Sequence, residues 1–276
     1  MGFTGLARWI DAPTTGLNLI SENIVRNYHG QYKGEWQVGI RSYRSTFNNE
    51  PSLNLPAERT MATFTMGENV FVLLDDPISP GRYDLQTLSL ATKPTHLKST
   101  YITLSPPGAL EQLLSLLRAR WGSVRGQTTG PQLTIKGSIF SIGTDWMVRV
   151  GNVITSTGAV KGILLEAEYL PLPTVTVLLG DNTSEMVTNL LTSVLPQIPG
   201  AKTLAVTVSD FEWAEVIFYE NEEGENVEKK EDSEDDIWAS GEDEETMFKP
   251  GDWVGVERDR RSAYLIIGAL RSEGII

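Results

Sequence analysis

Two glutamates separated by one residue, Glu166 and Glu168, are the side chains whose types and spacing best suit chemistry. Residues two apart on a β-strand project to the same face of the sheet. Two carboxylates on one face can hold a divalent cation, because hard cations prefer oxygen ligands. Such a pair inside a barrel is typical of a metal-dependent hydrolase of phosphate compounds, and this activity is one hypothesis for the chain.

The residues around the pair do not complete that site. Triphosphate tunnel hydrolases carry a Glu-x-Glu-x-Lys sequence on a barrel strand, whereas Leu170 stands here at the position of the lysine. The neighbouring strands also offer few Arg or Lys residues that would face inward and bind phosphates. We therefore interpret Glu166 and Glu168 as an ordinary carboxylate pair on a solvated sheet face. The hydrolase stays as an alternative.

Other catalytic constellations are missing from the sequence. His29 and His96 are its only histidines, and it has no cysteine, which excludes disulfides and thiolate metal sites. Neither a Gly-x-Ser-x-Gly sequence nor a phosphate-binding or dinucleotide-binding glycine loop is present. We predict no catalytic, cofactor-binding or metal-binding residues, hence a protein that is not an enzyme and needs no cofactor.

The charge is concentrated in one segment. Residues 220–245 hold 14 acidic residues against two lysines, so 21 basic and 22 acidic residues remain for the rest of a chain with a net charge of −13. This nearly neutral remainder lacks the basic face that binds nucleic acid through counterion release. Residues 220–247 are predicted to be a disordered insertion, because their composition cannot bury enough apolar surface to offset chain ordering.

The acidic segment supports another hypothesis, an acidic chaperone-like binder of basic proteins. Ile237 and Trp238 form an isolated apolar pair within it, which resembles a short docking motif. A tolerated variable insertion explains the segment as well.

The chain shows neither a secretory signal nor an apolar run approaching the roughly 20 residues that cross a bilayer, which predicts a soluble intracellular protein.

Four segments have the apolar spacing of amphipathic helices. They are residues 14–28, 108–121, 183–195 and 253–271. The last contains Arg258-Asp259-Arg260-Arg261, which we interpret as an exposed helix face rather than a nuclear import signal. Most tryptophans, among them Trp36, Trp121 and Trp146, are predicted to be core residues, because burial of a large apolar side chain stabilises the fold by about 1.5–3 kcal/mol.

The strand predictions come from alternating apolar residues and turn signals. Strands are expected at residues 35–47, 60–66, 69–74, 101–104, 132–142, 145–154 and 160–170. The short links around Gly67 and Gly143 imply antiparallel neighbours. Helices before and after such strands predict an α+β fold, mainly an antiparallel β-barrel-like sheet flanked by several helices. Residues 1–219 and 248–276 are expected to form one such domain, interrupted by the insertion at 220–247.

Several motifs resemble the centre of the Mediator subunit 20 family. Arg125-Gly126 is followed by Val150-Gly151-Asn152-Val153, then by Lys161-Gly162-Ile163 and Glu166-Ala167-Glu168-Tyr169. The opening Met1-Gly2-Phe3-Thr4 is similar to that family's Met-Gly-Val-Thr. The acidic segment suggests a fungal-type member. Together, the matching segments cover about a third of the chain.

The resemblance implies a non-catalytic structural subunit of the Mediator head module in the nucleus. Its family forms a direct heterodimer with Mediator subunit 18, which has a related fold, and subunit 8 tethers the pair to the other head subunits. The head contacts RNA polymerase II and the initiation machinery, so the expected mechanism is scaffolding. We expect no direct nucleic acid binding and no membrane association.

Overall fold

The computed structural model describes residues 3–45, 59–81, 84, 97–117, 121–123, 131–171, 185–195 and 255–276. Its strands are β1 (Phe3–Trp9), β2 (Gln31–Ser45), β3 (Thr60–Met66), β4 (Asn69–Asp75), β5 (Ser99–Leu104), β6 (Trp121–Ser123), β7 (Leu133–Ile142), β8 (Trp146–Thr155) and β9 (Val160–Tyr169). Its helices are α1 (Gly16–Asn27), α3 (Gly108–Leu117), α4 (Glu185–Val194) and α6 (Val256–Ser272).

The strands of these residues form one antiparallel sheet. Its order is β1-β9-β8-β7-β2-β3-β4-β5, and β6 pairs additionally with β2. The predicted meander of β7, β8 and β9 is confirmed, as is the β3–β4 hairpin. Gly67 lies at the hairpin turn with a positive φ of 57°, a conformation that glycine adopts without steric cost.

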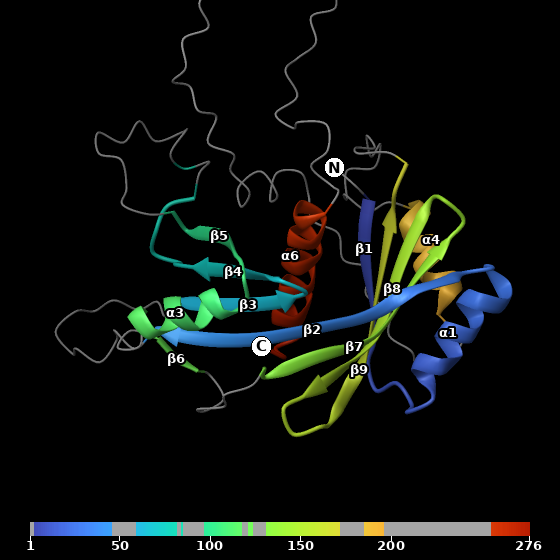
Figure 1. Cartoon of the computed structure of the whole chain (residues 1–276), viewed down its shortest axis with the longest axis horizontal. Helices are drawn as coiled ribbons and strands as arrows, with labels where there is room; N and C mark the ends of the chain where they lie inside the picture. The colour runs from blue at the N-terminus through green and yellow to red at the C-terminus, as the bar shows by residue number, and fades with distance from the viewer. Residues whose placement is uncertain are drawn as a thin grey trace, which may run out of the picture.

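Strand β2 joins the two halves of the sheet. Its first part pairs with β7 and its second part with β3, so the long strand crosses the whole molecule (Figure 1). The sheet curls around this strand. The predicted α+β fold with a barrel-like antiparallel sheet is therefore confirmed.

Helix α6 lies inside the curl, between the two ends of the sheet order (Figure 1). It contacts β1, β3 and β4, and Arg260 near its start is hydrogen-bonded to Tyr101 of β5. Its apolar residues face the concave side of the sheet. That face and α6 form the main core, which includes Leu6, Trp36, Ile40, Phe64, Leu164, Ile266 and Leu270.

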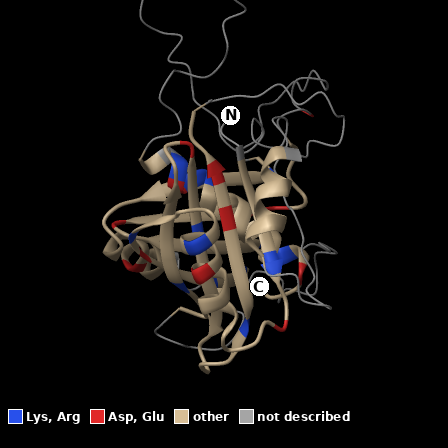
Figure 2. Ribbon diagram, turned by 90° about the vertical axis from the view of Figure 1, so that its right-hand side faces the viewer, with Lys and Arg blue, Asp and Glu red and all other residues tan. Residues whose placement is uncertain are grey.

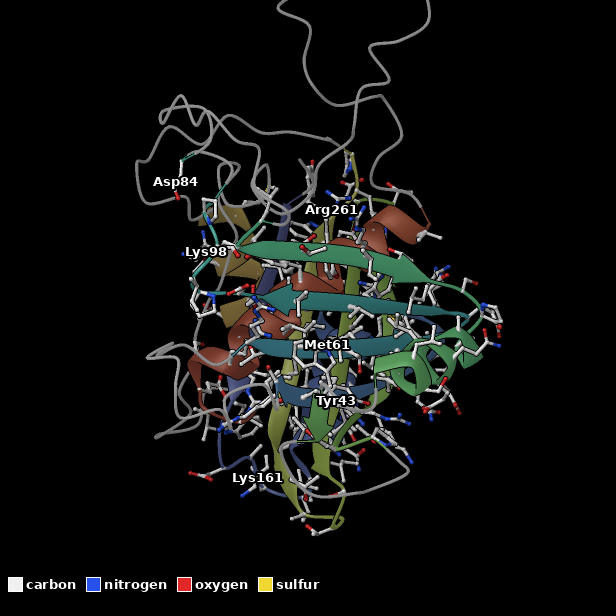
Figure 3. The ribbon with its side chains drawn as sticks, turned by 90° about the vertical axis from the view of Figure 1, so that its left-hand side faces the viewer. Tyr43, Met61, Asp84, Lys98, Lys161 and Arg261 are labelled. Atoms are coloured by element: carbon white, nitrogen blue, oxygen red, sulfur yellow. The ribbon has the colours of Figure 1, made fainter. Side chains whose placement is uncertain are left out.

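The other helices cover the convex face. α1 and α4 pack on β1, β7, β8 and β9 and bury Ile20, Ile24, Val187 and Leu191. Gly5 permits this packing, since a Cβ atom there would lie 2.4 Å from a methyl group of Val187. Leu110 of α3 packs with residues of β2, β3 and β4, among them Tyr43 and Met61. Figure 3 shows Tyr43 and Met61 on the face of the sheet that is turned away from α6.

The structure corrects the predicted elements in three places. Strand β1 is absent from the sequence predictions, although its side chains alternate between two buried faces. Trp121 does not belong to the helix before it but begins β6. The segment 31–34, not assigned from the sequence, starts β2. The predicted insertion at 220–247 lies outside the described residues, so it and the domain boundaries stay predictions.

No helix in the described ranges combines the length and the apolar character that are needed to span a membrane.

Candidate functional site

The two glutamates of β9 point into the interior of the curled sheet. Glu166 is 0% exposed and Glu168 is 2% exposed. The prediction that they form a surface pair on a solvated face is wrong. Alternate residues of β9, Leu165 and Ala167, pack under the outer helices, so both faces of this strand are covered. The spacing correctly predicted a shared face but carried no information on what covers it.

A buried arginine lies beside this pair. The antiparallel register places Arg149 of β8 directly opposite Glu166, and an Arg149 amino group donates a hydrogen bond of 2.9 Å to Glu166 Oε2. The other terminal nitrogen of Arg149 lies 3.9 Å from Glu168 Oε2. Arg149 therefore faces inward, and it neutralises the carboxylate of Glu166.

The first turn of α6 completes this group of charges. Arg258 Nε lies 2.9 Å from Glu168 Oε1, and Asp259 Oδ1 lies 3.7 Å from a terminal nitrogen of Arg149. We call Arg149, Glu166, Glu168, Arg258 and Asp259 the ion cluster. Figure 2 shows the charged positions on the ribbon from the side of the molecule on which β8 and β9 lie. The cluster joins β8 and β9 to a helix that lies about ninety residues further along the chain.

Burial and neighbouring charges oppose each other in this cluster. Burial raises the pKa of Glu168, and the nearby guanidinium groups of Arg149 and Arg258 only partly offset that rise. Burial likewise raises the pKa of Asp259. For Arg149, burial lowers the pKa, but the attraction of Glu166 and Glu168 outweighs it and leaves the pKa raised. The arginine is thus held charged between carboxylates.

Acidification from about pH 7 to about pH 5 is expected to favour the wild-type chain over the Glu168→Gln variant. The folded pKa of Glu168 is raised above its ordinary value of 4.5, so the folded chain binds this proton more tightly than the unfolded chain. That stabilisation is complete below the unfolded pKa and is lost as pH rises through the folded pKa. Urea unfolding at both pH values measures it.

The difference in free energy of unfolding between wild type and Glu168→Gln should therefore grow as the pH falls. Glu22→Gln is the matched control, because this carboxylate is exposed and pairs with Arg26 on the surface of α1. An unchanged difference at the two pH values would count against the raised pKa of Glu168.

The far end of α6 makes a second set of ionic contacts. Arg271 pairs with Asp75 at the end of β4, and Glu273 Oε2 lies 3.0 Å from a terminal nitrogen of Arg8 on β1. Arg8 is 1% exposed and also donates to the Lys161 carbonyl oxygen at 3.3 Å. Burial lowers the pKa of Arg8, against the attraction of Glu273. These contacts attach α6 to both halves of the sheet.

Contacts of Arg260, near the start of α6, attach the helix to Tyr101 of the edge strand β5. Tyr101 donates its hydroxyl proton to the Arg260 carbonyl oxygen at 2.6 Å, and an Arg260 amino group donates to the Tyr101 carbonyl oxygen at 2.8 Å. The Arg260 guanidinium lies 5.1 Å from the centre of the Tyr101 ring, a cation–π distance. Tyr264 packs edge-on against the same ring.

The basic run of α6 is thus not an exposed helix face. Arg261 is 8% exposed and is labelled above β5 in Figure 3, and Arg258 and Asp259 belong to the ion cluster. The interpretation of Arg258-Asp259-Arg260-Arg261 as an exposed face is wrong, because these four side chains are buried or half-buried. The sequence did hold a signal that these charges are buried, because the apolar residues Leu265 to Ile267 follow them closely on the same helix.

The remaining candidates from the sequence do not gather at this site. His29 is exposed after α1, and His96 lies outside the described residues. Trp36 is buried in the main core, whereas Trp121 and Trp146 pack at the margins of the two outer clusters. In the described ranges, no three side chains of the metal-ligating types His, Cys, Asp and Glu are grouped to hold an ion.

Helix α6 fills the interior of the curved antiparallel sheet and is held there by ion pairs. This arrangement defines an α+β protein of the barrel-like class. The sequence model of the family described as TATA-binding related factor (TRF) of subunit 20 of Mediator complex matches residues 19–212. The chain therefore belongs to the Mediator subunit 20 family, and this confirms the resemblance found in its motifs. Mediator subunits act in the regulation of transcription.

Comparison with individual proteins adds little to this assignment. No curated protein matches the chain. A solved structure described as the putative adenylyl cyclase HpAC1 from Hippeastrum, with a dominant triphosphatase activity, is similar at 9% identity and a TM-score of 0.39, over 77% of this chain and 94% of that one. The structure of the PH1819 protein from Pyrococcus horikoshii OT3 is similar at 12% identity and a TM-score of 0.36, over 76% of this chain and 93% of that one. Neither likeness bears on the activity of this chain.

Proposed function

We propose that the chain is a non-catalytic structural subunit of the Mediator head module. It binds Mediator subunit 18 directly as a heterodimer, is tethered to the other head subunits through subunit 8, and acts in the nucleus. Its contribution to RNA polymerase II transcription is then to hold proteins together and to pass on regulatory input through their contacts. Family membership over residues 19–212 supports this proposal.

The observation that carries the non-catalytic part is the occupied interior of the sheet. A hydrolase of phosphate compounds needs room beside its carboxylates for a divalent cation and a substrate. Here Arg149 and Arg258 bind Glu166 and Glu168, and α6 fills the space beside them. A metal ion at this pair would have to displace two guanidinium groups and a packed helix.

Co-expression with subunit 18 of the same organism tests the proposal. A complex with the mass of one copy of each protein is expected in size-exclusion chromatography with light scattering. Co-expression with an unrelated β-rich protein is the control and should give two separate peaks. A monomer that ignores subunit 18 would contradict the heterodimer.

The chain purified alone serves to test the absence of catalysis. Purified chain incubated with nucleoside triphosphates and Mg²⁺ or Mn²⁺ should release no phosphate above the level of the Glu168→Gln variant. Metal-dependent release that this substitution abolishes would replace the structural role with the hydrolase.

A further inference from the structure

Strand β5 leaves one of its edges open. It stands at the end of the sheet order, and in the described part of the chain it pairs with β4 alone. The strand at the other end of the order differs, because residues 5–9 of β1 are buried, whereas Ile102 and Thr103 of β5 are exposed. An edge strand of this kind presents backbone groups with which another strand can pair.

The pairing with β4 decides which backbone groups of β5 point outward. The Asp76 N–H donates to the Lys98 carbonyl oxygen at 2.7 Å, one pair beyond the register of the two strands. Hydrogen-bonded and non-hydrogen-bonded pairs alternate in an antiparallel ladder, so the even-numbered residues of β5 bond to β4 through their backbones. The N–H and C=O groups of Tyr101 and Thr103 therefore point away from β4.

Arg260 covers this outer edge at Tyr101 but not at Thr103. An Arg260 amino group donates to the Tyr101 carbonyl oxygen at 2.8 Å, which agrees with the outward direction of that carbonyl. The backbone N–H and C=O of Thr103 have no hydrogen-bond partner among the described residues. The strand sequence Ser-Thr-Tyr-Ile-Thr-Leu also lacks the charges and prolines that protect many sheet edges. The open part of the edge is thus centred on Thr103.

The residues on either side of Thr103 make this edge complementary to itself. In an antiparallel pair of two copies centred on Thr103, Ile102 of each copy lies opposite Leu104 of the other. Both side chains are on the outer face of the sheet, where Ile102 is 39% exposed and Leu104 is half-buried. Apolar cross-strand pairs of this kind stabilise antiparallel sheets. The two Lys98 side chains lie at opposite ends of the pair and do not repel each other.

We propose that β5 is a dimerisation edge, and that it pairs with β5 of a second copy of this chain. The two strands run antiparallel about a two-fold axis at Thr103, and each Thr103 N–H donates to the Thr103 carbonyl oxygen of the other copy. Ile102 and Leu104 pack across the axis. Arg260 limits the pairing to a short stretch, because it already binds the carbonyl of Tyr101. The dimer is therefore weak and forms at high protein concentration.

Sedimentation velocity of the full chain alone, over a wide range of concentrations, tests the dimer. The mean mass is expected to rise with concentration from that of one chain, 30.5 kDa, toward twice this value. Thr103→Pro should raise the dissociation constant at least about tenfold, because proline has no N–H to donate. The single chain should tolerate this proline, since the Thr103 N–H does not bond to β4. Thr103→Val is the matched control and should dimerise like wild type, because it keeps the N–H and the branched shape.

A covalent cross-link tests the position of the two-fold axis. The chain contains no cysteine, so the cysteine introduced by Thr103→Cys can form a disulfide only with its own copy. Directly opposite residues in a hydrogen-bonded antiparallel pair have Cα atoms about 5.5 Å apart, within the range that a disulfide spans. Mild oxidation should convert Thr103→Cys to a covalent dimer much faster than Val160→Cys, the control at an exposed position on β9. This measurement also decides the question if Thr103→Pro fails to fold.

The proposal is overturned by any of three results. The mean mass stays that of one chain at every concentration, a folded Thr103→Pro variant dimerises as well as Thr103→Val, or Thr103→Cys cross-links no faster than Val160→Cys. None of these measurements involves subunit 18, so their outcome is independent of that of the heterodimer.

Discussion

Replacement of Arg149 by methionine is expected to lower the free energy of unfolding by about 3–5 kcal/mol, a large fraction of the stability of an ordinary domain. Within the described residues, Arg149 is the cation that pairs with Glu166, and both side chains are buried. The variant leaves the Glu166 carboxylate without this counter-ion in a place that water does not reach. Urea denaturation followed by tryptophan fluorescence measures the loss.

Two companions of this variant distinguish a lost ion pair from lost packing. Arg26→Met removes an exposed pair with Glu22 on α1 and should change stability by no more than about 0.5 kcal/mol. The double variant Arg149→Met with Glu166→Met should recover much of the loss, because replacement of a buried pair by apolar residues is often nearly neutral. If the double variant is less stable than Arg149→Met, the buried charge of Glu166 is not the source of the effect.

Truncation of Ile266 to alanine is expected to cost about 2–5 kcal/mol. Ile266 is 0% exposed, in the middle of α6, where it packs with core residues from both halves of the sheet. The cavity left behind weakens the contacts between the sheet and the helix that fills it. Thermal and urea unfolding, with near-ultraviolet circular dichroism as a second probe of aromatic packing, measure the effect.

The matched control for this prediction is Ile78→Ala. The same residue type stands there on the loop after β4 and is 50% exposed, so its truncation should cost well under about 1 kcal/mol. Equal losses at the two positions would mean that α6 does not contribute to the core in the way the structure indicates.

The sheet order also explains why the packing of α6 matters for the stability of the fold. β1 and β5 end the order and, in the described part of the chain, do not pair with each other. The helix contacts β1 directly and binds β5 through Arg260 and Tyr101. It thus takes the place that a further strand would occupy in a closed barrel.

Local sequence patterns were sufficient for most elements of this protein. Alternation of apolar residues, with glycines at the links, predicted the β3–β4 hairpin and the meander of β7, β8 and β9. Helical spacing located α1, α4 and α6 to within a few residues at each end. The motifs of β8 and β9 also indicated the family that the match over residues 19–212 confirms. These features depend on near neighbours along the chain.

What covers each face of the sheet became visible in the tertiary structure alone. The spacing of Glu166 and Glu168 predicted a common face, but the ion pairs that bury them come from β8 and from α6. Strand β1 was missed because both its faces are covered, so its residues lack an alternation between apolar and exposed polar side chains. Periodicity records how side chains point from their own backbone, whereas burial of a charge depends on partners distant in sequence, which no local pattern specifies.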